Sequence, residues 1–136
     1  MNATSGDPTC YRITEAAALI GVSDDTLRRW IKTKRLPASA DETGHRVVAG
    51  TDLAALAVEI AHAPQDPGAR STSARNRAVG LVTAVKKDAV MAQVDLQCGP
   101  FRFVSLMSRE AVDDLDLKVG DRAIAVVKAT TVVVEI

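Results

Sequence analysis

Hydrophobic and polar positions in residues 11–35 (YRITEAAALIGVSDDTLRRWIKTKR) repeat with the period of two short helices. The first helix is predicted over residues 15–20, with Thr14 as its N-cap and Gly21 as the residue that ends it. The second begins after Ser23, which supplies another N-cap hydroxyl. Two helices joined by so short a turn are typical of domains that place one helix in a DNA groove.

The second predicted helix has one apolar side and one cationic side. Leu27, Trp30 and Ile31 fall at helical spacing and are expected to face the core. Among residues 28–35, five of eight are Lys or Arg. A solvated helix face is the alternative explanation of these cations, because charge runs are common on exposed helices.

A β-hairpin and a third helix are predicted after the L-P dipeptide that breaks the second helix. A T-G turn forms the tip of this hairpin wing, which ends in His45 and Arg46. Thr51 is expected to cap the third helix, which runs through about residue 61.

Pro, Gly, Ser and Gln concentrate between the two patterned regions of the chain, and this is the composition of a linker. We therefore expect a linker at residues 63–71. It divides a helical domain at residues 11–62, preceded by a flexible N-terminus at residues 1–10, from a second domain at residues 72–136.

Strand alternation dominates the second domain, which also holds one short helix. Ser108 is expected to cap that helix, over residues 109–115. The fold class is thus α+β in two domains, the second a small antiparallel barrel of the OB kind filled by its own side chains. The five predicted strands span residues 79–85, 90–96, 101–107, 122–128 and 132–136.

Composition adds that both cores are small. The 136 residues are 47% hydrophobic but only 3% aromatic, so the cores are built from Ala, Val, Leu and Ile. Two such cores are each marginal, and oligomerisation is expected to add burial. The net charge is zero, and up to His62 the chain holds seven Lys or Arg against eight Asp or Glu. A monomer is therefore expected to bind DNA weakly.

Several function classes find no support in the sequence. Cys10 and Cys98 stand in no metal-ligand spacing and are interpreted as reduced thiols, with a disulfide as a minor alternative. No apolar run approaches membrane-spanning length and no signal layout opens the chain, so a cytoplasmic location is expected. No catalytic triad, metal-ligand cluster or glycine-rich phosphate loop is present, and an enzyme is not expected.

The segments TEAAALIGVSDDTLRRWIKTKRLP and TGHR resemble the MerR and excisionase type of winged DNA-binding domain over residues 11–61. In that family the second helix reads the major groove, and the wing touches the DNA backbone or the minor groove. The chain departs from the pattern at Val47, where many wings carry a second basic residue. A dimer on two half-sites would compensate for that loss. The DNA-contact residues that this resemblance implies are Ser23, Thr26, Arg28, Arg29, Lys32, His45 and Arg46.

The second half resembles the molybdate-binding Mop (TOBE) domain across residues 72–136. The resemblance rests on the S-A-R-N motif at residues 73–76, the S-L-M-S-R-E-A-V helix start, the L-x-V-G-D turn and the K-A-T motif at residues 128–130. It implies a tetrahedral oxyanion held between subunits, with the two motifs supplied by different chains. Met107 departs from the pattern, since many relatives carry Thr there. The implied oxyanion-binding residues are Ser73, Ala74, Arg75, Asn76, Ser105, Lys128, Ala129 and Thr130.

Together the two resemblances imply a molybdate-sensing transcriptional regulator. The expected ligand is molybdate or tungstate, with no cationic metal and no organic cofactor. The expected partners are double-stranded DNA and further copies of the chain, as a dimer or a larger assembly such as a hexamer, and no membrane. Two alternatives stay open: a molybdate storage protein, and an architectural DNA-binding protein whose barrel only oligomerises.

Overall fold

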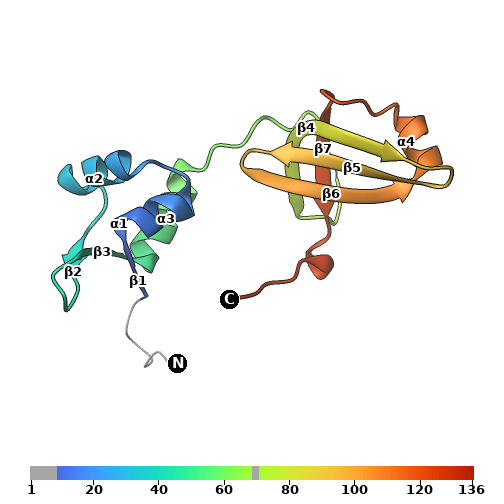
Figure 1. The fold of residues 1–136 in the computed structure, drawn as a ribbon. Helices are drawn as coiled ribbons and strands as arrows, with labels where there is room; N and C mark the ends of the chain where they lie inside the picture. Colours follow the sequence, from blue (N-terminus) through green and yellow to red (C-terminus); the bar gives the residue numbers. More distant parts are fainter. Residues whose placement is uncertain (1–8, 69–70) are drawn as a thin grey trace. The chain divides into compact units, whose positions relative to one another are not determined.

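The computed structural model describes residues 9–68 and 71–136. The chain forms two compact units, Met1–His62 and Ala63–Ile136 (Figure 1). Residues 1–8 of the expected flexible N-terminus and residues 69–70 of the expected linker lie outside the described part. Each unit is described by itself below.

The N-terminal unit is a helical domain with a small antiparallel sheet, in which the strand order is β1-β3-β2. The turn between β2 and β3 forms the wing, and Val47 and Val48 of β3 are both buried, Val48 within the core cluster of this unit. The elements in chain order are β1 (Cys10–Arg12), α1 (Ile13–Ile20), α2 (Asp24–Lys32), β2 (Ser39–Ala40), β3 (Arg46–Ala49) and α3 (Gly50–Ile60).

The core of this unit is aliphatic, as the composition predicts. Leu27 and Ile31 of α2 are buried, and Trp30 packs against the same cluster from a half-buried position. Ala16 and Ala17 of α1 are also buried, and their short side chains allow close packing at this cluster. The inward-facing side of α2 is therefore the one that the helical spacing predicts.

Two of the expected N-caps are wrong, and two of the helix boundaries are confirmed. Thr14 lies inside α1, which starts directly after β1, and its hydroxyl donates to Asp24 Oδ2 at 3.1 Å. The helix α3 begins at Gly50, one residue before Thr51, because β3 runs straight into it. Ser23 does cap α2, and Gly21 does end α1 in the left-handed conformation.

Cys10 also differs from expectation. It was placed in the flexible N-terminus, but it pairs with Ala49 in the β1–β3 ladder. The N–H of Gly50 donates to the carbonyl of Thr9 at 2.7 Å, which extends this edge of the domain by one more hydrogen bond. The sequence of β1 carries no strand alternation, so only its pairing with β3 defines it as a strand.

The second unit contains a four-stranded antiparallel sheet of order β6-β5-β4-β7. Ser108 caps its helix as predicted, accepting a hydrogen bond from the N–H of Ala111 at 3.0 Å. The elements are β4 (Asn76–Lys87), β5 (Met91–Cys98), β6 (Phe101–Ser108), α4 (Arg109–Leu115), β7 (Arg122–Val127) and a 3-10 turn, η1 (Ala129–Thr131).

The long strand β4 makes the sheet curl into a half-barrel. Its first half pairs with β7, and its second half pairs with β5, so that Leu81 lies in both ladders. The register with β5 shifts between Val82 and Ala84. Such an irregularity bends a strand and increases its twist. The predicted first strand is therefore correct in position but too short at both ends.

The fifth predicted strand, at residues 132–136, is wrong for the single chain. These residues follow η1 without strand structure and are exposed, with Val133 at 82% and Val134 at 84%. The β-branched composition favours a strand, but a strand also needs a neighbouring backbone to pair with. Within one chain no such pairing forms for these residues.

Candidate functional site

The two motifs of the second domain meet at one end of the β4–β7 ladder. Asn76 opposes Val127 in the register, and its side-chain amide donates to the Val127 carbonyl at 3.1 Å. Residues 73–75 lead into β4, and residues 128–130 leave β7 at the same end. Antiparallel pairing thus brings together two segments that lie far apart in the sequence.

The S-A-R-N segment is held in shape by Thr72. The N–H of Ala74 donates to Thr72 Oγ1 at 3.2 Å, and Arg75 Nη1 donates to the Thr72 carbonyl at 2.9 Å. Ala74 is buried, whereas Ser73 and Arg75 are exposed. The Ala74 amide is therefore engaged inside the chain, and its expected role as a backbone donor to an oxyanion requires that Thr72 release it.

The K-A-T segment forms the start of η1. The Lys128 carbonyl accepts from the Thr131 N–H at 2.9 Å and from the Thr131 hydroxyl at 2.8 Å. Lys128, Ala129 and Thr130 are exposed. The turn thus orders the backbone of the motif and leaves its ammonium and hydroxyl directed to solvent.

A shallow pocket of about 310 Å³ lies beside the two motifs. Its lining combines Arg75, Asn76 and Arg77 with apolar side chains that include Phe103 and Val127. A tetrahedral oxyanion only accepts hydrogen bonds, so guanidinium, amide and hydroxyl donors are the groups that can hold it. In the single chain, guanidinium and amide groups line this pocket, whereas Ser73, Lys128 and Thr130 do not.

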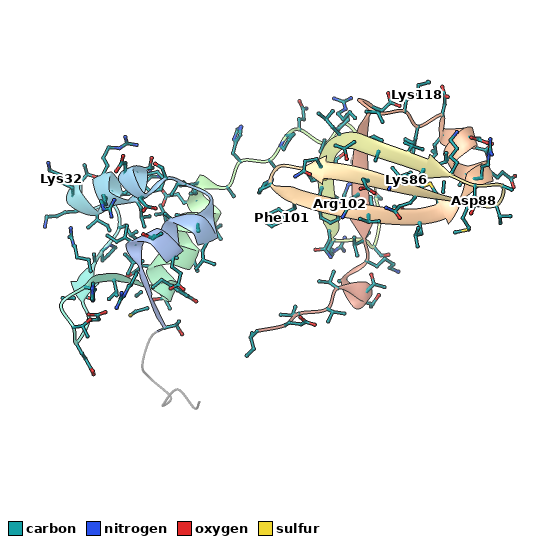
Figure 2. The ribbon with its side chains drawn as sticks, in the orientation of Figure 1. Lys32, Lys86, Asp88, Phe101, Arg102 and Lys118 are labelled. Carbon is teal, nitrogen blue, oxygen red and sulfur yellow. The ribbon has the colours of Figure 1, made fainter. Side chains whose placement is uncertain are left out.

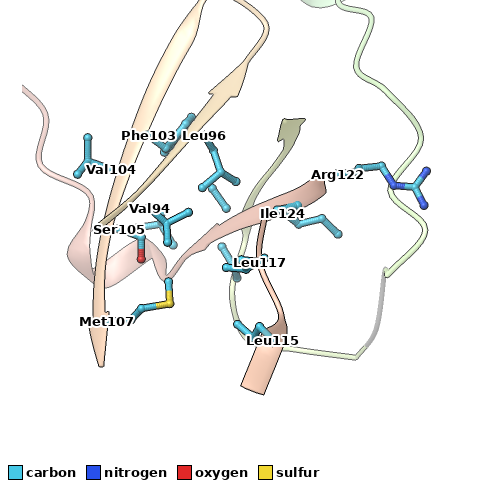
Figure 3. Close-up of a pocket in the computed structure, with 14 residues that line it drawn as sticks. Val94, Leu96, Phe103, Val104, Ser105, Met107, Leu115, Leu117, Arg122 and Ile124 are labelled. Carbon is cyan, nitrogen blue, oxygen red and sulfur yellow. The ribbon is translucent and has the colours of Figure 1, made fainter. Parts of the chain in front are cut away.

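Ser105 lies elsewhere. It sits on β6, at the opposite edge of the sheet from β7, and it lines a larger groove together with Met107 (Figure 3). The structure therefore does not gather Ser105 into the pocket beside Arg75 and Asn76 within one chain.

In the first domain the expected DNA-contact residues divide into exposed cations and cap residues. Arg28, Arg29 and Lys32 are exposed on α2, and Figure 2 shows Lys32 on this helix. Ser23 and Thr26 instead bind each other: the Ser23 hydroxyl lies 2.9 Å from that of Thr26 and accepts the Thr26 N–H at 3.1 Å. Their first role is thus to start the helix.

The wing is organised around one carboxylate. Asp41 Oδ1 accepts from the backbone N–H of Thr43 and of His45, both at 2.9 Å, and from the Thr43 hydroxyl at 2.8 Å. The Thr43 hydroxyl, followed by the other donors, lowers the pKa of Asp41. His45 and Arg46 remain exposed at the wing, while Val47 is buried.

Arg35 belongs to the cationic run but serves the fold. It forms an ion pair with Glu59 of α3 at 3.0 Å, and its guanidinium lies 4.8 Å from the centre of the Trp30 ring. Such stacking favours a fixed indole. Trp30 therefore packs against the core, as the helical spacing predicts, and Arg35 covers its ring.

Two family models match the chain. Residues 72–134 match the TOBE domain, and residues 10–57 match a helix-turn-helix domain. Molybdenum-pterin-binding protein 3 of Clostridium pasteurianum is 42% identical over 65 residues, which are 47% of this chain and 96% of that protein. The chain belongs to the TOBE family. Both resemblances seen in the sequence, and the α+β fold class, are thereby confirmed.

Further relatives match the same half of the chain. A probable molybdenum-pterin-binding protein of Haemophilus influenzae is 40% identical over 63 residues. The match covers 46% of this chain and 91% of that protein. The solved structure of a molybdate-binding protein from Sporomusa ovata is 33% identical and covers 48% of this chain and 98% of its own, with a TM-score of 0.47.

The TOBE domain leaves an apolar groove open in the single chain. The groove has a volume of about 630 Å³ and lies on the concave face, where residues of the edge strands β6 and β7 line it (Figure 3). The single chain is therefore an open half-barrel with this groove, and not a closed barrel filled by its own side chains. The terminal V-V-V-E-I, expected as the fifth strand, is exposed.

Two other expected features can be checked in residues 9–68 and 71–136. Over this part of the chain no group of His, Cys, Asp and Glu side chains is placed to hold a metal ion. No helix in the same residues is long and apolar enough to span a membrane. Cys98 is buried in the TOBE domain, and burial raises the pKa of its thiol.

Proposed function

We propose that this protein is a DNA-binding regulator that responds to molybdate or tungstate. The observation that carries the proposal is the pairing of Asn76 with Val127, which puts the S-A-R-N and K-A-T motifs side by side. The same chain carries a helix-turn-helix domain with an exposed cationic helix. A sensor needs both parts, and no organic cofactor or catalytic step is required.

Oxyanion binding would use the charged and hydroxyl groups that are exposed at this end of the ladder. Arg75 and Lys128 would neutralise the dianion, while Ser73 and Thr130 would donate hydroxyl hydrogen bonds. Asn76 is already bound to the Val127 carbonyl and would hold the two motifs at a fixed spacing. Ala74 and Ala129 would contribute backbone N–H groups, and Ser105 would contribute a hydroxyl from a neighbouring subunit.

A second copy of the chain would complete the TOBE domain. The groove between β6 and β7 is apolar and open, and residues 132–136 are apolar, exposed and without strand structure. Closure of a sheet removes exposed strand edges, and burial of these side chains supplies the driving force. We propose a dimer or larger assembly, such as a hexamer, in which the oxyanion lies between subunits. The reduced thiols favour a cytoplasmic location.

DNA binding would follow from the same assembly. Arg28, Arg29 and Lys32 would enter the major groove on α2, while His45 and Arg46 would contact the backbone from the wing. A domain with so few cations binds one half-site weakly, and two domains on two half-sites bind more tightly. The oxyanion changes DNA affinity only as far as it binds one arrangement of the two domains better than another.

Titration calorimetry with molybdate, and with sulfate as the control anion, tests the sensor half. Arg75→Ala and Lys128→Ala should each lose about 1.5–3 kcal/mol of binding free energy, a tenfold or greater weakening. Arg102→Ala is the matched control, since Arg102 of β6 is an exposed arginine that pairs with Asp95 of β5. Wild-type affinity in both site variants would eliminate this site.

Selection of a duplex from random DNA, with and without molybdate, tests the other half. Arg29→Ala should weaken binding to the selected duplex and leave molybdate affinity intact. A storage protein is the second candidate, because the N-terminal domain carries no net positive charge and Val47 is buried. The storage function predicts that the protein binds molybdate and selects no preferred DNA duplex. Salt-sensitive DNA binding without any molybdate effect would instead indicate an architectural protein.

A further inference from the structure

Part of the expected linker is bound to the TOBE domain. Asp66 receives the guanidinium of Arg77, from Nε to Oδ2 at 2.6 Å and from Nη2 to Oδ1 at 3.3 Å. Arg77 Nη2 also donates to the Gly68 carbonyl at 3.2 Å, and the Gly68 N–H donates to Asp66 Oδ1 at 2.9 Å. We call this set of contacts among Asp66, Gly68 and Arg77 the linker clamp.

The linker clamp is more sheltered than an ordinary surface ion pair. Both side chains are only 22% exposed, whereas in the similar Arg102–Asp95 pair the arginine is 59% and the aspartate 13% exposed. Gly68 lies against β7, where a Cβ in its place would come within 3.3 Å of Ile124 Cδ1. The Arg77 hydrogen bond is the main reason that the pKa of Asp66 lies below its ordinary value. The linker clamp is therefore a packed, half-buried contact of the TOBE domain.

The position of the linker clamp connects it to the oxyanion site. Arg77 directly follows the S-A-R-N motif and opposes Val126 in the β4–β7 ladder. The residue that directly follows the motif therefore also holds Asp66 of the expected linker. A movement of the motif acts directly on the next residue, Arg77.

The free tether that remains is short. The helix α3 ends at Ile60, and the clamp begins at Asp66, so five residues, 61–65, separate them. They include Pro64, which restricts the backbone further. Short and stiff tethers restrict the range of positions of the groups that they connect more than long flexible ones do.

We propose that the linker clamp transmits the state of the oxyanion site to the DNA-binding domain. Binding at residues 73–75 displaces the neighbouring Arg77, and its ion pair with Asp66 passes this change to the tether and hence to α3. The proposal rests on the proposed function. It adds that Asp66 and Arg77 set the response to the oxyanion and that Asp66 takes no part in binding it.

The test compares wild type with Asp66→Ala and with Asp95→Ala, which removes the carboxylate of the matched Arg102 pair. For each protein, molybdate affinity is measured by calorimetry. DNA affinity is measured with and without saturating molybdate, on a duplex that the wild-type protein selects from random DNA. Couplings of this kind usually change affinity by roughly 5- to 150-fold. We expect that factor to fall to about one in Asp66→Ala, at molybdate concentrations that calorimetry shows to saturate this variant, and to persist in Asp95→Ala.

Four results would overturn the proposal, each in a distinguishable way. A wild-type response in Asp66→Ala shows that coupling bypasses the clamp. Equal loss in Asp66→Ala and Asp95→Ala shows a general effect of removing a carboxylate from the domain. A wild-type protein whose DNA affinity ignores molybdate refutes the proposed sensor function itself. In addition, ¹⁵N relaxation should show the Gly68 amide as rigid as β4 in wild type and mobile in Asp66→Ala; equal mobility in both also overturns it.

Discussion

Truncation of Leu27 should unfold the DNA-binding domain and leave the TOBE domain folded. Leu27 is fully buried in the centre of the N-terminal core. Replacing such a leucine with alanine costs about 2–5 kcal/mol, because a cavity remains where the side chain packed. A domain of about 54 residues has a total stability of only about 3–8 kcal/mol at ordinary values per residue. Leu27→Ala therefore removes a large share of it.

Calorimetric unfolding of the full chain measures this directly. The transition of the helical domain should shift down by about 12–24 °C for a loss of about 3 kcal/mol, or vanish, while the second transition keeps its position. Molybdate binding should persist and DNA binding should be lost. Leu19→Ala is the control, because Leu19 is 60% exposed on α1 and its truncation should cost less than about 0.5 kcal/mol. Equal effects of the two substitutions, or joint loss of both transitions, would refute the reasoning.

The TOBE domain supports three further predictions. Gly80→Ala should destabilise it by about 1–3 kcal/mol in urea unfolding, since the added Cβ would come within 2.6 Å of Cys98 Sγ; an unchanged midpoint would contradict the close packing there. Ser108→Ala should cost about 1 kcal/mol through loss of the α4 N-cap, and Ser108→Asp, which can still cap, should restore it. The Met91 and Val90 N–H groups lower the pKa of Asp88, so the stability it contributes is present above about pH 4 and is lost as pH falls through the lowered pKa. Asp88→Asn should make the fall of the urea midpoint shallower as the pH is lowered from about 5 to about 2; a wild-type slope would contradict the assignment.

Local signals in the sequence were sufficient for most of the helical domain. The apolar positions of α2 predicted which side of that helix is buried. Ser23 correctly predicted the start of α2, and Gly21 correctly predicted the end of α1. The N-caps predicted at Thr14 and Thr51 are wrong, because β1 and β3 run directly into α1 and α3. A cap residue is a local preference, whereas the start of a helix after a strand depends on pairing with a distant strand.

The sequence by itself determined the two domains' character, the number and order of their helices and the residue types of the two oxyanion motifs, because periodicity, caps and short motifs are local properties. Tertiary structure alone decided three other matters. It paired Asn76 with Val127 across the sheet, it bound Asp66 of the expected linker to Arg77, and it left residues 132–136 outside the sheet. Each depends on which distant backbone lies alongside, and the pattern of hydrophobic residues along the chain does not specify that neighbour.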